Sequence, residues 1–124
     1  MILRLGEDGR RVLAAFHRAM AAVASSGVDV VCEAVVYDQA DWEDWTDALN
    51  ATHSIWINLN APLSVLEERE RTRPEAVRGL ARGTLTRERV GAYDLAIDTS
   101  TTTVDEAVNR IIVLIEATQR RQSG

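Results

Sequence analysis

The chain has 124 residues and a net charge of −5, with 46% hydrophobic and 27% charged residues. This length suits one domain over residues 1–124, and the composition is typical of a globular protein rather than a disordered or fibrous one. No apolar run reaches the roughly 20 residues that span a bilayer, no secretory signal opens the chain and basic residues are not in surplus, so we expect a cytoplasmic protein with no membrane or nucleic-acid partner.

The first part of the chain is expected to form a helix, a buried strand and a second helix. Apolar residues three and four positions apart predict an amphipathic helix over residues 9–26, with Val12, Ala15, Phe16, Ala19, Met20 and Val23 on its buried face. The apolar, β-branched run 28–37 predicts a strand covered on both faces in a parallel sheet, which would bury the single cysteine, Cys32. Residues 38–49 predict a short helix.

A second strand, a helix and an arginine-rich segment are expected next. Residues 54–59 predict the strand, and residues 63–72 predict the helix, with Pro62 in its first turn. Residues 73–92 predict a polar excursion or a loosely held pair of helices, because proline and glycines are spread among arginines. All fourteen basic residues are arginine, and seven of them lie close together: Arg69, Arg71, Arg73, Arg78, Arg82, Arg87 and Arg89.

The last part of the chain predicts a third strand over residues 94–98 and a helix over residues 104–119. Thr103 and Glu106 are spaced as a capping box, and the buried face would carry Val104, Ala107, Val108, Ile111, Ile112 and Ile115. Helices that alternate with short apolar strands predict an α/β fold of three layers around a mostly parallel sheet.

Three segments in order resemble the chloramphenicol phosphotransferase family of small-molecule kinases. They are VVCEAVVYD, PLSVLEERERTR followed by RGLARG, and AYDLAIDTS. The resemblance implies a P-loop kinase-like fold, ATP and magnesium as cofactors, and transfer of the γ-phosphate to a hydroxyl of a small molecule.

The resemblance also implies parts that these 124 residues do not encode. The phosphate-binding motif G-x-x-x-x-G-K-[ST] needs a lysine, and the chain has none. The first strand, the loop and the family's proposed aspartate base would lie upstream of Met1. We therefore expect a sheet incomplete at that strand, a chain inactive alone, and an unpaired sheet edge through which two copies could associate.

The arginine-rich segment, residues 69–92, gives the strongest chemical signal. Guanidinium groups make bidentate bonds to phosphate, and Arg69 and Arg73 match the arginines that open the family's lid, so they are the predicted catalytic pair. Arg78 is a weaker candidate for cofactor binding. A solvated helix face with glutamate partners is the simpler alternative.

Other candidates follow the predicted strands. Glu33 is an acid in the middle of an apolar run, and the resemblance places it beside magnesium-bound water; an ion pair with an arginine is the alternative. Tyr37 and Asp38 are expected to face substrate, since ligands bind beyond the carboxyl ends of parallel strands, although Asp38 as a helix cap explains them equally well. Asp98 and Thr99, followed by Ser100, would lie near the adenine, or would simply make a turn before the last helix.

The remaining aromatic and histidine residues give weaker signals. Trp56 is predicted to fill core, whereas Trp42 and Trp45 could fill core or line an aromatic pocket. His17 is assigned to the polar side of the first helix, and neither it nor His53 has the company of metal ligands. A function from another class stays open, in which a non-catalytic α/β module binds an acidic partner through its arginines.

Overall fold

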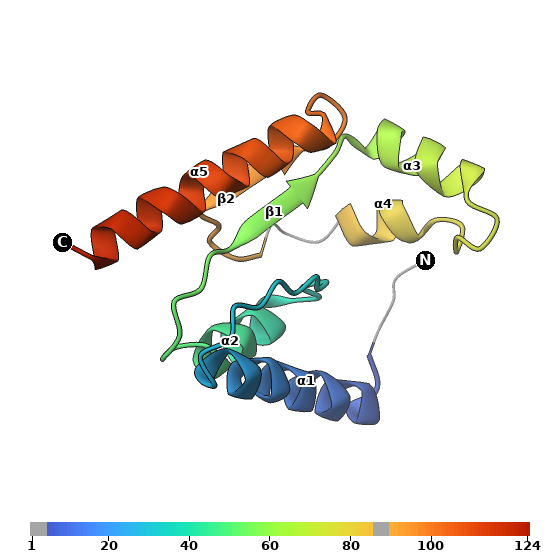
Figure 1. Ribbon diagram of the computed structural model, residues 1–124. Coiled ribbons are helices and arrows are strands. Elements are labelled where there is room, and N and C mark those ends of the chain that lie inside the picture. The colour runs from blue at the N-terminus through green and yellow to red at the C-terminus, as the bar shows by residue number, and fades with distance from the viewer. Residues whose placement is uncertain (1–4, 86–89) are drawn as a thin grey trace. The chain divides into compact units, whose positions relative to one another are not determined.

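The computed structural model describes residues 5–85 and 90–124 of the chain (Figure 1). The chain divides into two compact units, one drawn from Met1–Ser54 and Val77–Gly91 and the other from Ile55–Ala76 and Ala92–Gly124. The predicted segment 69–92 is therefore shared between the units. Arg87 and Arg89 of that segment lie outside the described residues.

The first unit is built on two helices that pack side by side, α1 (Glu7–Ser25) and α2 (Gln39–Ala48) (Figure 1). The Asp38 carboxylate caps α2 by accepting from the amide of Asp41 at 2.9 Å. A short helix, α4 (Leu80–Leu85), belongs to the same unit. The described part of segment 73–92 contains this one helix, whereas the sequence predicted either a polar excursion or a loosely held pair of helices.

The face of α1 that packs on α2 is not the apolar face predicted from the sequence. Val12, Phe16 and Val23 are exposed, whereas His17, assigned to the polar side, is only 1% exposed. Trp45 of α2 is buried at 2% and lies against both rings, with its centroid 5.6 Å from that of Phe16 and 4.0 Å from that of His17. The prediction for α1 is wrong because periodicity identifies an apolar stripe, whereas the residues on the neighbouring helix decide which stripe is covered.

The predicted buried strand at residues 28–37 is absent from the described structure. The segment forms neither helix nor strand, and Val31 and Val35 in it are exposed. Cys32 is also exposed, so the expected buried thiol is wrong. A strand needs a neighbour for its amide and carbonyl groups, and an apolar sequence alone does not supply one.

The second unit holds two parallel strands, β1 (Ile57–Asn60) and β2 (Leu95–Asp98), which lie side by side in Figure 1. Ile57 is in register with Leu95, and Asn60 with Asp98. β1 begins three residues after the predicted start at 54 and ends one residue after the predicted end at 59, whereas β2 begins one residue after the predicted start at 94 and ends at 98 as predicted. Ile97 of β2 is fully buried, whereas its partner in register, Leu59, is 63% exposed.

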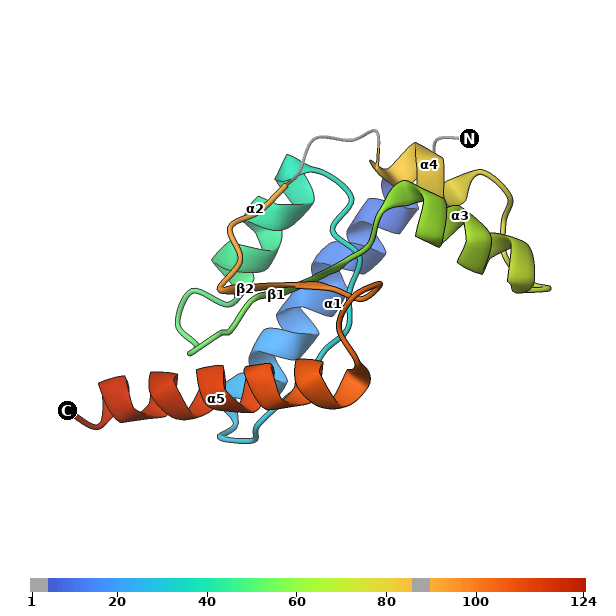
Figure 2. The same cartoon turned by 90° about the horizontal axis from the view of Figure 1, so that it is seen from above.

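Two helices complete this unit, α3 (Leu63–Thr72) and α5 (Val104–Gln122). The bounds of α3 and the start of α5 agree with the sequence prediction, and the capping box of Thr103 and Glu106 is present. Figure 2 shows α5 running beside β2, where Arg110 donates to the Ala96 carbonyl at 3.4 Å. The predicted buried face of α5 is wrong in large part, since Val104, Val108, Ile112 and Ile115 are exposed.

The mixed α/β class is confirmed, because the structure combines helices with a parallel sheet. Three strands were expected, and the described residues form a sheet of only two. The three-layer P-loop kinase arrangement stays a prediction. Across residues 5–85 and 90–124, no helix has the length and apolar character to cross a membrane.

Candidate functional site

The carboxyl ends of β1 and β2 carry a cluster of polar residues, defined here as the strand-end site: Asn60, Arg69, Asp98, Thr99 and Ser100. Asn60 and Asp98 are the last register pair of the two strands. The Asn60 carbonyl accepts from the Thr99 amide at 2.8 Å and from the Thr99 hydroxyl at 3.1 Å. Because both strands run parallel, the chain segments that follow them emerge at the same edge of the sheet.

Arg69 reaches this edge from α3. Its Nη1 donates to Thr99 Oγ1 at 2.8 Å, and its Nη2 donates to the Thr99 carbonyl at 3.0 Å. The Thr99 hydroxyl thus accepts from Arg69 while it donates to Asn60. The guanidinium group is exposed and bound in two places to neutral oxygen atoms.

Asp98 turns the chain between β2 and α5. Its Oδ1 accepts from the amide of Ser100 at 2.8 Å and also from the Ser100 hydroxyl. These hydrogen bonds, helped by the positive charge of Arg69, hold the pKa of the Asp98 carboxyl below its usual value. Asp98 is therefore ionised at neutral pH, and its carboxylate is close enough to Arg69 to be affected by the charge of the guanidinium.

At the strand-end site, a phosphate group could replace Thr99 as the hydrogen-bond partner of Arg69. A hydrogen bond from a guanidinium is stronger when the acceptor oxygen carries a negative charge than when the acceptor is neutral. A phosphate oxygen would therefore compete well for the Nη atoms that Thr99 now occupies, and the planar fork of arginine suits a bidentate contact. The negative charge of the Asp98 carboxylate would repel an anion here, although Asp98 Oδ1 already accepts two hydrogen bonds from Ser100.

The other predicted arginines are not joined to Arg69 by any contact in the described residues. Arg73 follows α3 in an extended conformation and is exposed, and its side chain makes no hydrogen bond or ion pair within the described ranges. Arg78 is exposed and belongs to the first unit. Arg71, two residues beyond Arg69 on α3, forms an ion pair with Glu68, as the simpler alternative expected for this helix face.

The three predicted substrate residues lie in the first unit. Glu33 is exposed, so the burial from which its function was argued does not occur. Asp38 caps α2 and forms an ion pair of 2.9 Å with Arg10 of α1. The amide of Tyr37 donates to Asp41 Oδ2 at 3.0 Å. The helix-cap alternative for Asp38 is thus confirmed, and substrate contact by these residues stays a prediction.

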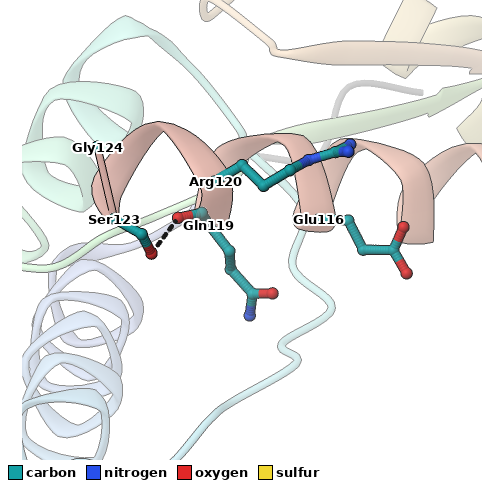
Figure 3. A pocket seen from close by; sticks show the side chains of 5 residues that line it. All are labelled: Glu116, Gln119, Arg120, Ser123 and Gly124. Carbon is teal, nitrogen blue, oxygen red and sulfur yellow. Dashed lines mark hydrogen bonds between the residues drawn. The ribbon is translucent and has the colours of Figure 1, made fainter.

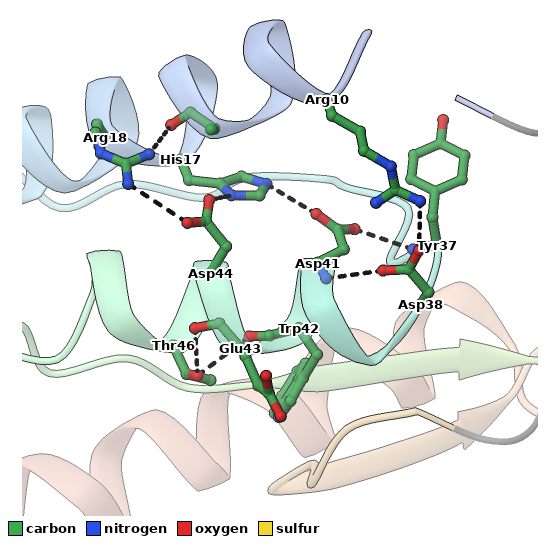
Figure 4. A network of polar contacts seen from close by, with 11 residues as sticks. Arg10, His17, Arg18, Tyr37, Asp38, Asp41, Trp42, Glu43, Asp44 and Thr46 are labelled. Atoms are coloured by element: carbon green, nitrogen blue, oxygen red, sulfur yellow. Dashed lines mark hydrogen bonds and ion pairs between the residues drawn. The ribbon is translucent and has the colours of Figure 1, made fainter. Parts of the chain in front are cut away.

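The first unit also contains a buried ionic cluster that the sequence analysis missed, drawn in Figure 4. His17 of α1 places Nδ1 2.6 Å from Asp44 Oδ2 and Nε2 3.2 Å from Asp41 Oδ1. The Nδ1 contact has hydrogen-bond geometry, whereas the Nε2 contact lacks it and is an ion pair only when the ring is protonated. The hydrogen bond from His17, with the charge of Arg18 in support, lowers the pKa of Asp44. Asp41 and Asp44 lie three residues apart on one helix face, and this spacing was the available signal.

A hollow on the surface of the described residues does not provide a further candidate for a functional site. A shallow depression on the end of α5 is lined by residues of that chain end only, drawn in Figure 3: Glu116, Gln119, Arg120, Ser123 and Gly124. Because no second element closes over it, this depression cannot exclude water from a reaction.

A model of the family described as chloramphenicol phosphotransferase-like protein matches residues 4–116. The match covers most of the chain, and with parallel strands that end in a guanidinium site it defines a kinase-like phosphotransferase class. The chain belongs to the chloramphenicol phosphotransferase-like family. Comparison with curated proteins and with solved structures gave no significant match.

The residues of this chain fit only part of what ATP and magnesium require. Arg69 can offer a bidentate contact to one phosphate group. The 124 residues contain no lysine to reach the β and γ phosphates. Among residues 5–85 and 90–124, no group of three acidic, histidine or cysteine side chains is placed to hold a metal ion. The described site therefore does not form a triphosphate cradle.

Proposed function

We propose that this chain is the arginine-bearing part of an ATP-dependent phosphotransferase that moves the γ-phosphate to a hydroxyl of a small molecule. The family match over residues 4–116 supports this class of reaction. The observation that carries the proposal is the position of Arg69, which reaches the carboxyl ends of two parallel strands and binds only neutral oxygen atoms there.

Arg69 is proposed to leave Thr99 and bind a phosphate oxygen with both Nη atoms. The exchange favours phosphate because at each nitrogen an anionic acceptor oxygen replaces a neutral one. Positive charge at this position would also stabilise the negative charge that develops on a phosphoryl group during transfer. Arg73, exposed and without a partner in the described residues, is the second arginine that could turn to the same group.

The test supplies the cradle that these 124 residues lack. The chain is fused to the N-terminal strand and phosphate loop of a chloramphenicol phosphotransferase, and transfer from γ-labelled ATP is measured against a panel of hydroxyl compounds. We expect transfer by the fusion and none by the 124 residues alone. Replacing Arg69 by alanine should slow transfer about 100-fold, the loss expected for one charge-stabilising donor.

The matched control is Arg71→Ala, on the same helix, since Arg71 is exposed and paired with Glu68 rather than with the strand ends. Equal rates for the Arg69 and Arg71 variants would remove Arg69 from the reaction. Transfer by the unfused chain would show that the lysine loop is not needed. Binding of an acidic protein by a fusion that transfers no phosphate would favour the non-catalytic module.

A further inference from the structure

The α1–α2 pair is held together at its centre by a histidine between two carboxylates. His17 is 1% exposed, and each ring nitrogen faces an oxygen from α2: Asp44 Oδ2 at 2.6 Å from Nδ1 and Asp41 Oδ1 at 3.2 Å from Nε2. The Asp41 side chain is also buried, at 4% exposed. A neutral imidazole has one N–H, so only the protonated ring offers a proton to both carboxylates.

Only one of the two contacts stays attractive when the ring of His17 loses a proton. The Nδ1 contact is shorter and has hydrogen-bond geometry, so the neutral ring keeps its proton on Nδ1. Nε2 then turns a lone pair toward the carboxylate of Asp41. Attraction becomes repulsion at this one contact, in a buried place where water screens it poorly.

Asp41 links the protonation of His17 to the backbone segment that precedes α2. Its Oδ1 faces His17, while its Oδ2 accepts from the amide of Tyr37 at 3.0 Å. One carboxylate therefore joins the ring of His17 to the backbone at Tyr37 (Figure 4). Next to Tyr37, Asp38 caps α2 and pairs with Arg10 of α1 at 2.9 Å.

We propose that His17 is a proton-dependent clamp, which in its protonated form holds α2 and the backbone at Tyr37 against α1 and in its neutral form releases Asp41. Asp41 and Asp44 face the ring from α2 and attract its protonated form, whereas Arg18 on α1, paired with Asp44 at 3.4 Å, opposes it. The neutral ring keeps its hydrogen bond to Asp44, so the repulsion arises at Asp41. This inference does not depend on the phosphotransferase proposal.

The test is an NMR titration of the unmodified 124-residue chain across the range in which histidines exchange protons, roughly pH 5 to 8. Ring nitrogen shifts report the protonation of His17, and the amide shift of Tyr37 reports its hydrogen bond to Asp41. We expect both to change with one common midpoint. A Tyr37 amide that stays constant while His17 titrates would overturn the proposal, and this arm needs no substitution.

A variant locates the coupling at Asp41. In Asp41→Asn the new side-chain amide can donate to the neutral ring, so loss of the His17 proton no longer makes this contact repulsive, and the Tyr37 amide should respond less to pH than in the unmodified chain. Asp47→Asn on the same helix is the control, because Asp47 is exposed and has no contact with His17. Equal pH responses of the Tyr37 amide in these two variants would also overturn the proposal, once circular dichroism shows equal helix content.

Discussion

Arg69 and Thr99 are joined by two hydrogen bonds, from Nη1 to the hydroxyl at 2.8 Å and from Nη2 to the carbonyl at 3.0 Å. These bonds tie the last turn of α3 to the turn after β2, across 30 residues of sequence. The contact brings a predicted catalytic residue to a predicted cofactor residue at the carboxyl edge of the sheet. The arginine is therefore already at the edge where a phosphate contact would be useful, and Thr99 occupies its donors.

Ile97 should contribute far more to stability than Leu59, although the two are partners in register. Ile97 is fully buried and Leu59 is 63% exposed. Ile97→Ala should lower the free energy of unfolding by about 2–5 kcal/mol, because it leaves a cavity, whereas Leu59→Ala should change it by less than about 1 kcal/mol. Urea denaturation measures both values. Equal losses would show that this face of the sheet is covered in solution.

Gly91→Ala should destabilise the first unit more than Gly27→Ala. Both glycines have positive φ, at 100° and 89°, so alanine brings backbone strain of about 1–2 kcal/mol at either position. At Gly91 the new Cβ would also meet Trp42 Cε3 at 2.8 Å, whereas nothing lies within 4 Å at Gly27. The added cost at Gly91 should be about 1–3 kcal/mol. Thermal unfolding followed by tryptophan fluorescence measures the difference, which should vanish if Trp42 does not rest on Gly91.

The contribution of Asp98 to the free energy of unfolding should be lost when the carboxyl is protonated in acid. Its pKa is lower in the folded chain, through hydrogen bonds from Ser100, than in the unfolded chain, where the pKa of the carboxyl has its ordinary value of 3.8. The unfolded state therefore binds the proton more readily, and the stability that Asp98 contributes is present above about pH 4 and is lost as the pH falls through the folded pKa. In Asp98→Asn this part of the acid-induced loss should disappear. Denaturation midpoints in the two proteins that decline in parallel below that pH would exclude the effect.

Local signals predicted the elements of the second unit well. Pro62 and the charged run after it gave both bounds of α3, and Thr103 with Glu106 gave the start of α5, because caps and first turns depend on neighbours a few residues away. The strand-end site could be predicted in part for a similar reason, since residues that follow parallel strands meet at one edge.

Features that depend on distant partners could not be predicted in the same way. The run 28–37 has the residues of a buried strand, but pairing is a property of the neighbour, and the described structure supplies none. The covered face of α1 is decided by Asp41, Asp44 and Trp45 on α2 rather than by its apolar stripe. His17 was assigned to the wrong face of α1 because hydrophobic periodicity treats histidine as a polar residue. Periodicity also gives no information about the hydrogen bond between His17 and Asp44, which lie 27 residues apart in the sequence.

The most direct test of the central claim follows the guanidinium resonances of the 124-residue chain during titration with pyrophosphate. The account predicts that the Arg69 signals and the Thr99 amide shift together and saturate, while Arg71, paired with Glu68, does not follow. It also predicts that Arg69→Lys, which keeps the charge and loses the bidentate fork, weakens the binding. Signals of Arg69 that stay unchanged, or that move no more than those of Arg71, would contradict the claim that the strand-end site takes a phosphate group.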